Sequence, residues 1–327
     1  IFILADDPLG RDVLSRLTKK AAQGIRVRLL LDGVGSFTLP KMLLRPLAQA
    51  GGEIAWFIPV LHRPLRGRSN LRNHRKIVIA DGARVWTGGR NLAQEYLDPG
   101  SNWIDLSFCL QGPAIASYLA IFEADWHFAR NQPADKPAPL SAAPAHEESS
   151  RVQVIPSGPD VADDPIYAAV LTACYEARQR IMIVTPYYVP DTGLQEALRL
   201  AALRGVVVDM ILPETSNHRL ADIARNRYLR ELAKAGARIW LLPRVMVHAK
   251  ALLVDRSFAL AGSANLDIRS LFRNYEVVSS FYSASDIDWL ARWMETLRER
   301  SAQHQPRPAG LLKEILEGVI LLGAYEI

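Results

Sequence analysis

Apolar and polar residues follow two different periods along this chain, and the two periods alternate. Short runs of aliphatic and β-branched residues, such as IRVRLLLD at 25–32 and VVVDMILP at 206–213, predict strands. A helix-like stretch precedes each run and ends at a glycine, Gly24 or Gly205. Because strands that alternate with helices form mixed or parallel sheets covered on both faces, we expect an α/β fold.

The order of these signals occurs twice. The first copy passes through blocks at 21–33, 47–57 and 73–92, and the second through blocks at 201–214, 232–242 and 247–266. A repeated order predicts the duplication of one α/β unit rather than two unrelated domains. Residues 131–150 are rich in Pro and Ala and fit neither period, so they predict an extended linker. We expect a first half at 1–130, the linker at 131–150, a second half at 151–302 and an amphipathic C-terminal segment at 303–327.

The C-terminal segment contains one further helical pattern. Its apolar face would consist of Leu311, Leu312, Ile315, Leu316, Val319 and Ile320. Lys313, Glu314 and Glu317 fall on the other face. The 13 residues from Leu311 to Gly323 are too few to span a bilayer, but they are enough to lie on one or to pack on the protein. Both alternatives stay open.

The composition excludes several classes of protein. A chain of 327 residues that is 49% hydrophobic and 22% charged can bury a large core, which excludes disorder and a fibrous repeat and leaves room for two domains. Two cysteines, Cys109 and Cys174, cannot build a disulfide framework or a Cys-rich zinc site. The net charge of +5 suits contact with phosphates or an anionic membrane, and equally a solvated surface.

The third block of each copy contains the same chemical motif. His74, Lys76 and Asp81 follow the pattern H-x-K-x-x-x-x-D, and His248, Lys250 and Asp255 follow it again. A second cluster comes after each Asp, namely Gly88-Gly89-Arg90-Asn91 and Gly262-Ser263-Ala264-Asn265. The His-to-Asn separation is 17 residues in both copies. One H-x-K would be an ordinary packing pattern, but two matched copies indicate a functional site.

The residue types of the motif fit chemistry on a phosphodiester. His and Lys lie two apart next to a strand, so they point to the same side. A His can attack phosphorus or protonate a leaving alkoxide, while Lys and Asn can hold the phosphate oxygens. The Asp that ends each strand is expected to bond nearby backbone. Lys between the candidate ligands repels a cation, and H-E-x-x-H and C-x-x-C are absent, so we expect neither a metal nor a cofactor.

The paired motifs resemble those of the phospholipase D superfamily. More narrowly, the flanking segments are similar to bacterial cardiolipin synthases; these segments are LDGVGS at 31–36, NLRNHRK at 70–76, WIDLSFCLQGP at 103–113, VIPSGP at 154–159, TPYYVP at 185–190 and NLDIRSLFRNYEV at 265–277. The resemblance implies two α/β/α sandwich halves related by a pseudo-twofold axis, with one metal-free active site where they meet. It also implies a covalent phosphohistidine, with His74 as nucleophile and His248 as general acid and later base.

The resemblance implies a function as well. A phosphatidyltransferase of this kind forms cardiolipin from two phosphatidylglycerol molecules and releases glycerol, at the surface of a bacterial membrane. The alternatives are a phospholipase D-type hydrolase or a nuclease, which would use water as acceptor, and a non-catalytic lipid-binding protein. Nucleic acid is not the expected partner, although the basic stretch at 62–76 would attract lipid head groups and nucleic-acid phosphates alike.

Five further residues are candidates for supporting roles. A catalytic His needs an acceptor for its second ring nitrogen, and Asp105 and Glu276 lie at similar distances downstream of the two motifs. Asn91, Asn265 and Ser263 are candidates for binding the phosphate oxygens.

Overall fold

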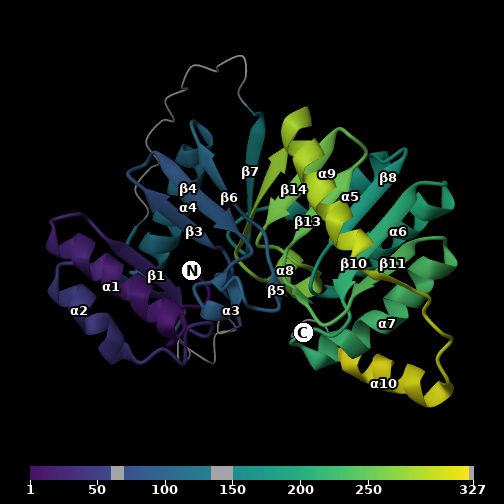
Figure 1. Ribbon diagram of the computed structural model, residues 1–327, viewed down its shortest axis with the longest axis horizontal. Helices are drawn as coiled ribbons and strands as arrows, with labels where there is room; N and C mark the ends of the chain where they lie inside the picture. The colour runs from purple at the N-terminus through teal and green to yellow at the C-terminus, as the bar shows by residue number, and fades with distance from the viewer. Residues whose placement is uncertain (60–69, 134–149, 324–327) are drawn as a thin grey trace. The chain divides into compact units, whose positions relative to one another are not determined.

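The chain forms two compact units in the computed structural model, which describes residues 1–59, 70–133 and 150–323 (Figure 1). The first unit comprises Ile1–Ser101 and Ser107–Pro144, and the second comprises Asn102–Leu106 and Ala145–Ile327. The short segment Asn102–Leu106 therefore belongs to the second unit, although first-unit chain precedes and follows it. Residues 134–149 of the expected linker and residues 62–69 of the basic stretch lie outside the described residues.

The first unit combines short parallel and antiparallel strand groups with flanking helices. Its described elements are α1 (Pro8–Ala22), β1 (Arg28–Asp32), a 3-10 turn (Lys41–Leu44), α2 (Arg45–Gln49), β2 (Glu53–Phe57), β3 (Ile77–Ala80), β4 (Arg84–Gly88), α3 (Gln94–Leu97), β6 (Ser107–Gln111) and α4 (Ala114–Ala129). Strands β1 and β2 are parallel, and β3, β4 and β6 form an antiparallel sheet. Asp7 caps the N-terminus of helix α1, and its Oδ1 accepts a hydrogen bond from Gly10 N at 2.8 Å.

The second unit is built on one eight-stranded sheet with the order β17-β11-β10-β8-β13-β14-β16-β7. Its strands are β5 (Trp103–Ile104), β7 (Val152–Ser157), β8 (Arg180–Val184), β9 (Tyr188–Val189), β10 (Val207–Pro213), β11 (Arg238–Leu242), β12 (Met246–Val247), β13 (Ala251–Val254), β14 (Phe258–Gly262), β15 (Leu266–Asp267), β16 (Glu276–Phe281) and β17 (Ala302–His304). Its helices are α5 (Pro165–Glu176), α6 (Thr192–Leu203), α7 (Arg219–Lys234), α8 (Ile268–Phe272), α9 (Ala284–Glu299) and α10 (Leu311–Leu322).

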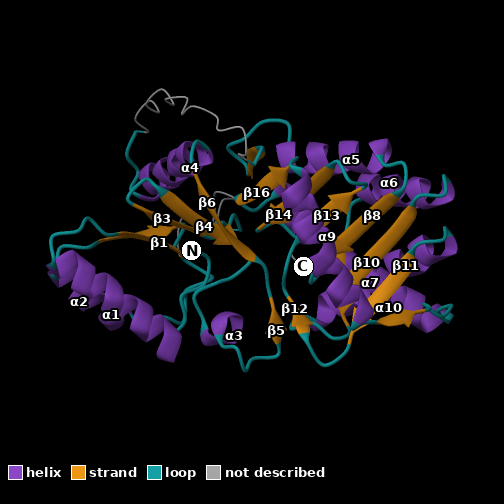
Figure 2. Cartoon of the chain, turned by 45° about the horizontal axis from the view of Figure 1, so that its top comes forward, coloured by secondary structure: helices purple, strands orange, loops and turns teal. Residues whose placement is uncertain are grey.

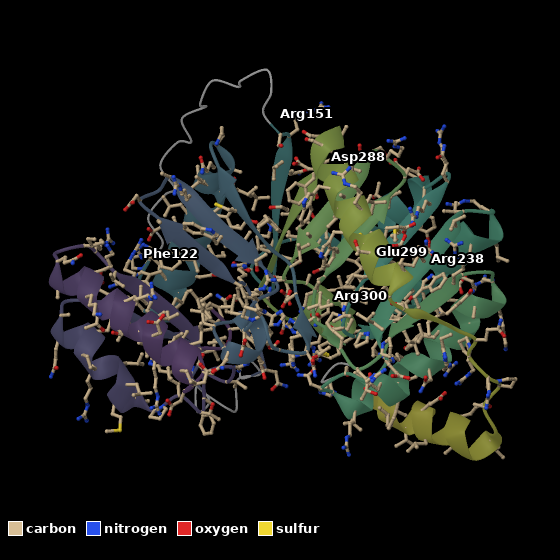
Figure 3. The ribbon with its side chains drawn as sticks, viewed as in Figure 1. Phe122, Arg151, Arg238, Asp288, Glu299 and Arg300 are labelled. Atoms are coloured by element: carbon tan, nitrogen blue, oxygen red, sulfur yellow. The ribbon has the colours of Figure 1, made fainter. Side chains whose placement is uncertain are left out.

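Helices cover both faces of this sheet (Figure 2). The residues of β10 alternate between the faces, as a strand requires: Val208, Met210 and Leu212 join the core formed with α5, α6 and α7. Asp209 and Ile211 point to the opposite face, where α9 packs, and side chains fill the space between the layers (Figure 3). The α/β class expected from the sequence is confirmed.

The two units repeat the same order of elements. Strands β1-β2 and β3-β4-β6 of the first unit correspond to β10-β11 and β13-β14-β16 of the second. Helices α1 and α4 correspond likewise to α6 and α9. In the second unit β8 lies between β10 and β13, and no described strand of the first unit occupies the matching place.

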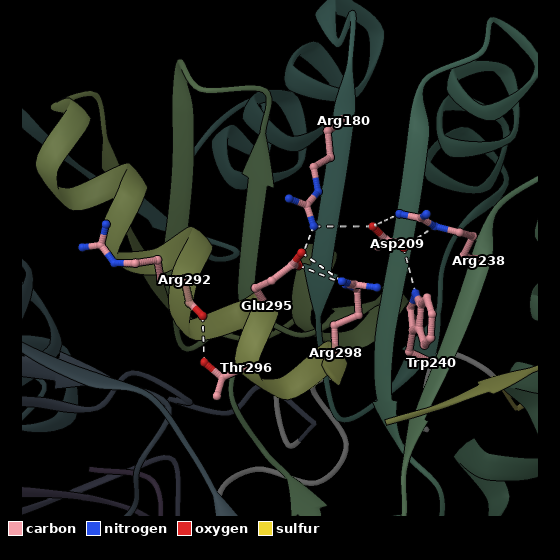
Figure 4. A network of polar contacts seen from close by, with 8 residues as sticks. All are labelled: Arg180, Asp209, Arg238, Trp240, Arg292, Glu295, Thr296 and Arg298. Atoms are coloured by element: carbon pink, nitrogen blue, oxygen red, sulfur yellow. Dashed lines mark hydrogen bonds and ion pairs between the residues drawn. The ribbon is translucent and has the colours of Figure 1, made fainter. Parts of the chain in front are cut away.

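A buried carboxylate holds α9 against the sheet (Figure 4). Asp209 accepts hydrogen bonds from Arg238 Nη2 at 2.6 Å and from Trp240 Nε1 at 2.7 Å. Arg180 lies 3.6 Å from the same carboxylate and bonds Glu295 of α9 at 2.7 Å. The network therefore ties three parallel strands to the helix that covers them.

None of the helices in the described ranges combines the length and apolar character that crossing a bilayer demands. Helix α10 packs along α7 within the second unit (Figure 1).

Candidate active site

The first motif lies in the segment that leads into β3. His74 is buried, and the edge of its ring meets the ring of Phe2 with centroids 4.9 Å apart. Lys76 is also buried, and its Nζ donates a hydrogen bond to the main-chain oxygen of His74 at 2.7 Å. This bond turns the ammonium group back toward the His, so the two side chains of the motif share one small region of the first unit.

Two buried carboxylates hold the segment that contains His74. Asp32, at the end of β1, accepts from the main-chain N–H of Asn73 at 2.9 Å. Asp125, on α4, accepts from Asn73 Nδ2 at 2.8 Å and pairs with Arg75 at 2.6 Å. Burial raises the pKa of Asp32, partly offset by its backbone hydrogen bonds. The contacts of Asn73 and Arg75 with these carboxylates fix the residues on both sides of His74.

This arrangement changes the interpretation of the basic stretch at 62–76. Arg72 lies 3.7 Å from Asp32 and Arg75 lies 2.6 Å from Asp125, with all four side chains buried. These two arginines act inside the first unit rather than at a surface that would attract anions. Residues 62–69 lie outside the described ranges.

Strand register brings the second motif to its carboxylate. Strand β12 pairs in parallel with β5, with Met246 opposite Trp103 and Val247 opposite Ile104. The next pair in this register is His248 and Asp105. His248 N donates to Ile104 O at 2.7 Å, and His248 Nδ1 lies 2.7 Å from Asp105 Oδ2. All of these residues belong to the second unit.

The pairing with Asp105 determines which ring nitrogen of His248 carries the proton. A carboxylate accepts and cannot donate, so Nδ1 carries the proton, and Nε2 is the ring nitrogen that Asp105 does not bind. Burial alone would raise the pKa of Asp105, but the charge and hydrogen bond of His248 and the charge of Lys250 outweigh it and lower that pKa. Asp105 therefore stays ionised and stabilises a positive charge on the imidazole.

Lys250 repeats the local geometry of Lys76. Its Nζ donates to the main-chain oxygen of His248 at 2.5 Å, and it lies 2.8 Å from His248 Nδ1 and 3.0 Å from Nε2. Burial lowers the pKa of Lys250 to about 8, although Asp105, Glu276 and Asp267 act in the opposite direction. A cation this close to Nε2 is in place to attract the negative charge of a phosphate oxygen that forms a hydrogen bond with Nε2.

The end of β14 is too crowded for a side chain at its last residue, Gly262. A Cβ on Gly262 would lie 2.4 Å from Val277 O, so this position requires glycine because of close backbone approach. The hydroxyl of Ser263 bonds Glu276 Oε2 at 2.5 Å and accepts from Val277 N at 3.0 Å. Glu276 also accepts from Asn274 Nδ2 at 3.3 Å.

The two motif asparagines differ in their contacts. Asn91 is buried in the first unit, and its Oδ1 accepts from Ile3 N at 3.2 Å. Asn265 is buried in the second unit, and its Oδ1 has no hydrogen-bond partner within the described part of the chain. An unpaired buried amide oxygen is costly and is typical of a site that receives a ligand group.

The two motif aspartates stand at turns, apart from the His–Lys pairs. Asp81 and Asp255 adopt left-handed backbone conformations, with φ of 55° and 51°. Asp255 accepts from the main-chain N–H groups of Arg178, Gln179 and Arg180 at 2.8 to 3.0 Å. The four residues of β13, about 13 Å of extended chain, separate Asp255 from Lys250.

The sequence patterns did not single out several residues that shape the site. Asp32 and Asp125 are two, and Asp267 is a third: it caps α8 by accepting from Ser270 N at 2.6 Å. Burial raises the pKa of Asp267 to about 6. A carboxylate within or at the end of an apolar run was the available signal for each. No group of three His, Cys, Asp or Glu residues in the described ranges could hold a metal ion.

A duplicated α/β fold with a His–Lys pair in each copy defines a member of the phospholipase D superfamily. The family model described as "Cardiolipin synthase, PLD-like domain" matches residues 2–126 and 170–298, which is most of the chain. The chain belongs to this family, and the resemblance seen in the sequence is confirmed.

Relatives in the family are similar over most of this chain. It is 34% identical over 307 residues to the major cardiolipin synthase ClsA of Bacillus subtilis, covering 91% of this chain and 62% of that protein. It is 37% identical over 281 residues to cardiolipin synthase A of Pseudomonas aeruginosa, covering 85% of this chain and 56% of that protein. The chain spans about 60% of the length of the curated relatives it matches.

A solved structure shares the fold. The phosphatidylserine synthase of Haemophilus influenzae aligns with a TM-score of 0.71 at 12% identity, covering 100% of this chain and 89% of that one.

Proposed function

We propose that this protein is a phosphatidyltransferase that forms cardiolipin from two phosphatidylglycerol molecules through a covalent phosphohistidine. The observation that carries the proposal is the buried contact of 2.7 Å between Asp105 and His248, with Lys250 Nζ 2.8 Å from His248 Nδ1 and 3.0 Å from Nε2. A carboxylate, an imidazole and a cation gathered in one buried cluster are suited to moving a proton beside a phosphate. The family and its relatives named as cardiolipin synthases support the choice of substrate.

The first half-reaction cleaves one phosphatidylglycerol. His74 Nε2 attacks phosphorus and forms the P–N bond, while the P–O bond to the glycerol head group breaks. His248 gives its Nε2 proton to the departing glycerol oxygen, and Asp105 holds the ring in the required tautomer. Lys76 and Lys250 offset the charge that develops on the phosphoryl oxygens, and Asn91 and Asn265 are the proposed further contacts to them. Ser263 is a third proposed contact, and to donate to a phosphoryl oxygen its hydroxyl must exchange its hydrogen bond to Glu276.

The second half-reaction transfers the phosphatidyl group. A glycerol hydroxyl of a second phosphatidylglycerol gives its proton to His248 and attacks phosphorus, and the P–N bond to His74 breaks. Glu276 is the proposed carboxylate that orients the second catalytic histidine, as Asp105 orients His248. Asp81 and Asp255 support the turns that end β3 and β13 and take no part in the chemistry. No metal or cofactor enters either step.

The test is product analysis with phosphatidylglycerol as the sole lipid. Purified protein incubated with phosphatidylglycerol dispersed in detergent should yield cardiolipin and free glycerol in equal amounts, measured by mass spectrometry. His74→Ala and His248→Ala should each reduce the rate by about a thousandfold or more. His304→Ala, which changes a His outside both motifs, is the matched control and should retain full activity.

Two results would overturn the proposal. Phosphatidic acid as the product would make the protein a hydrolase with water as acceptor. Full activity in His74→Ala would exclude the proposed phosphohistidine, and full activity in His248→Ala would exclude the proposed acid and base. We further propose that the protein works at a bacterial membrane surface, because both substrates are membrane lipids.

A further inference from the structure

Helix α10 exposes the apolar residues that an amphipathic helix usually buries. Leu311 is 74% exposed, Ile315 54% and Val319 60%, and these positions repeat every four residues along one side. Leu316, next to this line, is also more than half exposed. We call these four residues the outer stripe. The helix has 12 residues and is about 18 Å long, so the outer stripe runs over most of its length.

The inner side of α10 is fixed by a buried ion pair. Glu317 is fully buried, and its carboxylate forms a two-pronged contact with Arg230 of α7, of which the Nη1–Oε1 distance is 3.0 Å. Ile320 and Leu321 pack next to Val189 and Ile268. Because Arg230 requires Glu317 on the inside, the helix cannot turn its outer stripe inward without leaving a buried charge unpaired.

We propose that the outer stripe of α10 inserts into the interfacial layer of an anionic phospholipid bilayer. Apolar side chains on one side of a short helix, with the helix parallel to the surface, are the usual means of such binding. The choice of a bilayer as the occupant rests on the proposed function, since an enzyme whose two substrates are membrane lipids must meet their surface.

The charges around α10 agree with an anionic surface. Helix α7, along which α10 lies, exposes Arg219, Arg227 and Lys234, whereas its Arg225 and Arg230 are buried in ion pairs. The exposed acidic residue of α10 is Glu314, so basic residues outnumber it here. Arg307, also exposed, comes four residues before α10. Each basic residue near an anionic surface contributes attraction that salt weakens.

The contacts of α10 also connect it with the second motif. The cluster that receives Ile320 and Leu321 includes Val189 of β9, and β9 pairs with β15, with Val189 opposite Asp267. Asn265 immediately precedes β15. A helix bound to the bilayer at this place would therefore hold the Gly-Ser-Ala-Asn loop of the second unit at a fixed depth relative to the lipid.

Vesicle binding tests the proposal separately from catalysis. The probe is vesicles of phosphatidylglycerol and phosphatidylcholine, with bound protein measured by flotation. Ile315→Gln/Val319→Gln should reduce the partition coefficient about tenfold or more, since glutamine keeps helix propensity and removes the inserted surface. Leu203→Gln/Trp289→Gln is the matched control, because these residues are 57% and 52% exposed on other helices, and it should bind as the parent does.

Activity on detergent-dispersed phosphatidylglycerol should be unchanged in the α10 variant. If the parent makes no cardiolipin there, the proposed function fails, whereas undiminished vesicle binding by the variant overturns the bilayer proposal.

A second readout uses Val319→Cys in a Cys109→Ser background, labelled with an environment-sensitive dye. Vesicles should shift the dye to an apolar signal. A shift that depends on protein concentration without vesicles would show that a second copy covers the outer stripe, which also overturns the proposal.

Discussion

Asp105 bonds one nitrogen of His248 and so decides what the other nitrogen can do. Asp105→Asn replaces a carboxylate that only accepts with an amide that can donate, so the ring can adopt the wrong tautomer. We expect kcat for cardiolipin formation to fall about a hundredfold or more, with little change in the thermal unfolding midpoint. If the variant is as active as the parent protein, Asp105 has no role in the mechanism. His304→Ala again serves as the control that should retain full activity.

The low pKa of Lys250 predicts a pH dependence of the reaction. Burial lowers this pKa to about 8, so the free enzyme loses the cation beside His248 as pH rises through that value. We expect kcat/KM to decline above pH of about 8, by up to tenfold per pH unit. Arginine stays protonated, so Lys250→Arg should move this decline to higher pH in whatever activity it retains. An unchanged alkaline limb would contradict the assignment.

At the residue scale, the sequence predicted the motif side chains but not their partners. His74, Lys76, His248 and Lys250 could be located because two copies match in type and spacing. Asp105 was a candidate, yet its partner followed only from the register of β5 on β12, which joins residues 143 apart in the chain. Ser263 was expected to bind phosphate, and the structure shows its hydroxyl engaged with Glu276 and Val277.

At the scale of elements, the segment before β3 depends on the carboxylates that hold it. Asp125→Ala leaves Arg75 buried without its partner at 2.6 Å. We expect the free energy of unfolding to fall by about 3 kcal/mol, because breaking a buried pair leaves an uncompensated charge. Urea denaturation measures this loss. The activity of the protein that remains folded should fall too, since Asn73 loses its second anchor beside His74.

The matched control is an exposed ion pair in the same unit. Asp12 and Arg16 lie 2.7 Å apart with side chains 52% and 76% exposed, so Asp12→Ala should change the free energy of unfolding by less than about 1 kcal/mol. Equal effects of the two substitutions would show that the buried pair does not hold the segment.

The sequence predicted the elements themselves better than their orientation. The two helix-then-strand blocks, in which Gly24 or Gly205 separates the helix from the strand, correspond to α1–β1 and α6–β10. A glycine after a helix and a β-branched run are both local signals. The sequence predicted which residues form the apolar side of α10, but it did not predict that most of this side faces away from the protein. Glu317 is buried because it pairs with Arg230 of α7. A pairing between residues so far apart in the chain does not change the periodic pattern of the sequence, so it could not be predicted.

At the scale of the whole molecule, the duplication predicts how the two motifs share one reaction. If His74 forms the covalent intermediate and His248 supplies and removes the proton, each is required for the same half-reaction. The rate lost in His74→Ala/His248→Ala should then be no greater than the loss in the more severe single variant, because residues that act as a unit are non-additive. Independent sites would instead leave each single variant with about half the parent rate.

Rapid-quench measurements in the presence of ³²P-labelled phosphatidylglycerol extend the test, since His248→Ala should retain some phosphohistidine while His74→Ala should form none. Label trapped in the His74→Ala variant would reverse the two roles, and label trapped in both would assign a nucleophile to each unit.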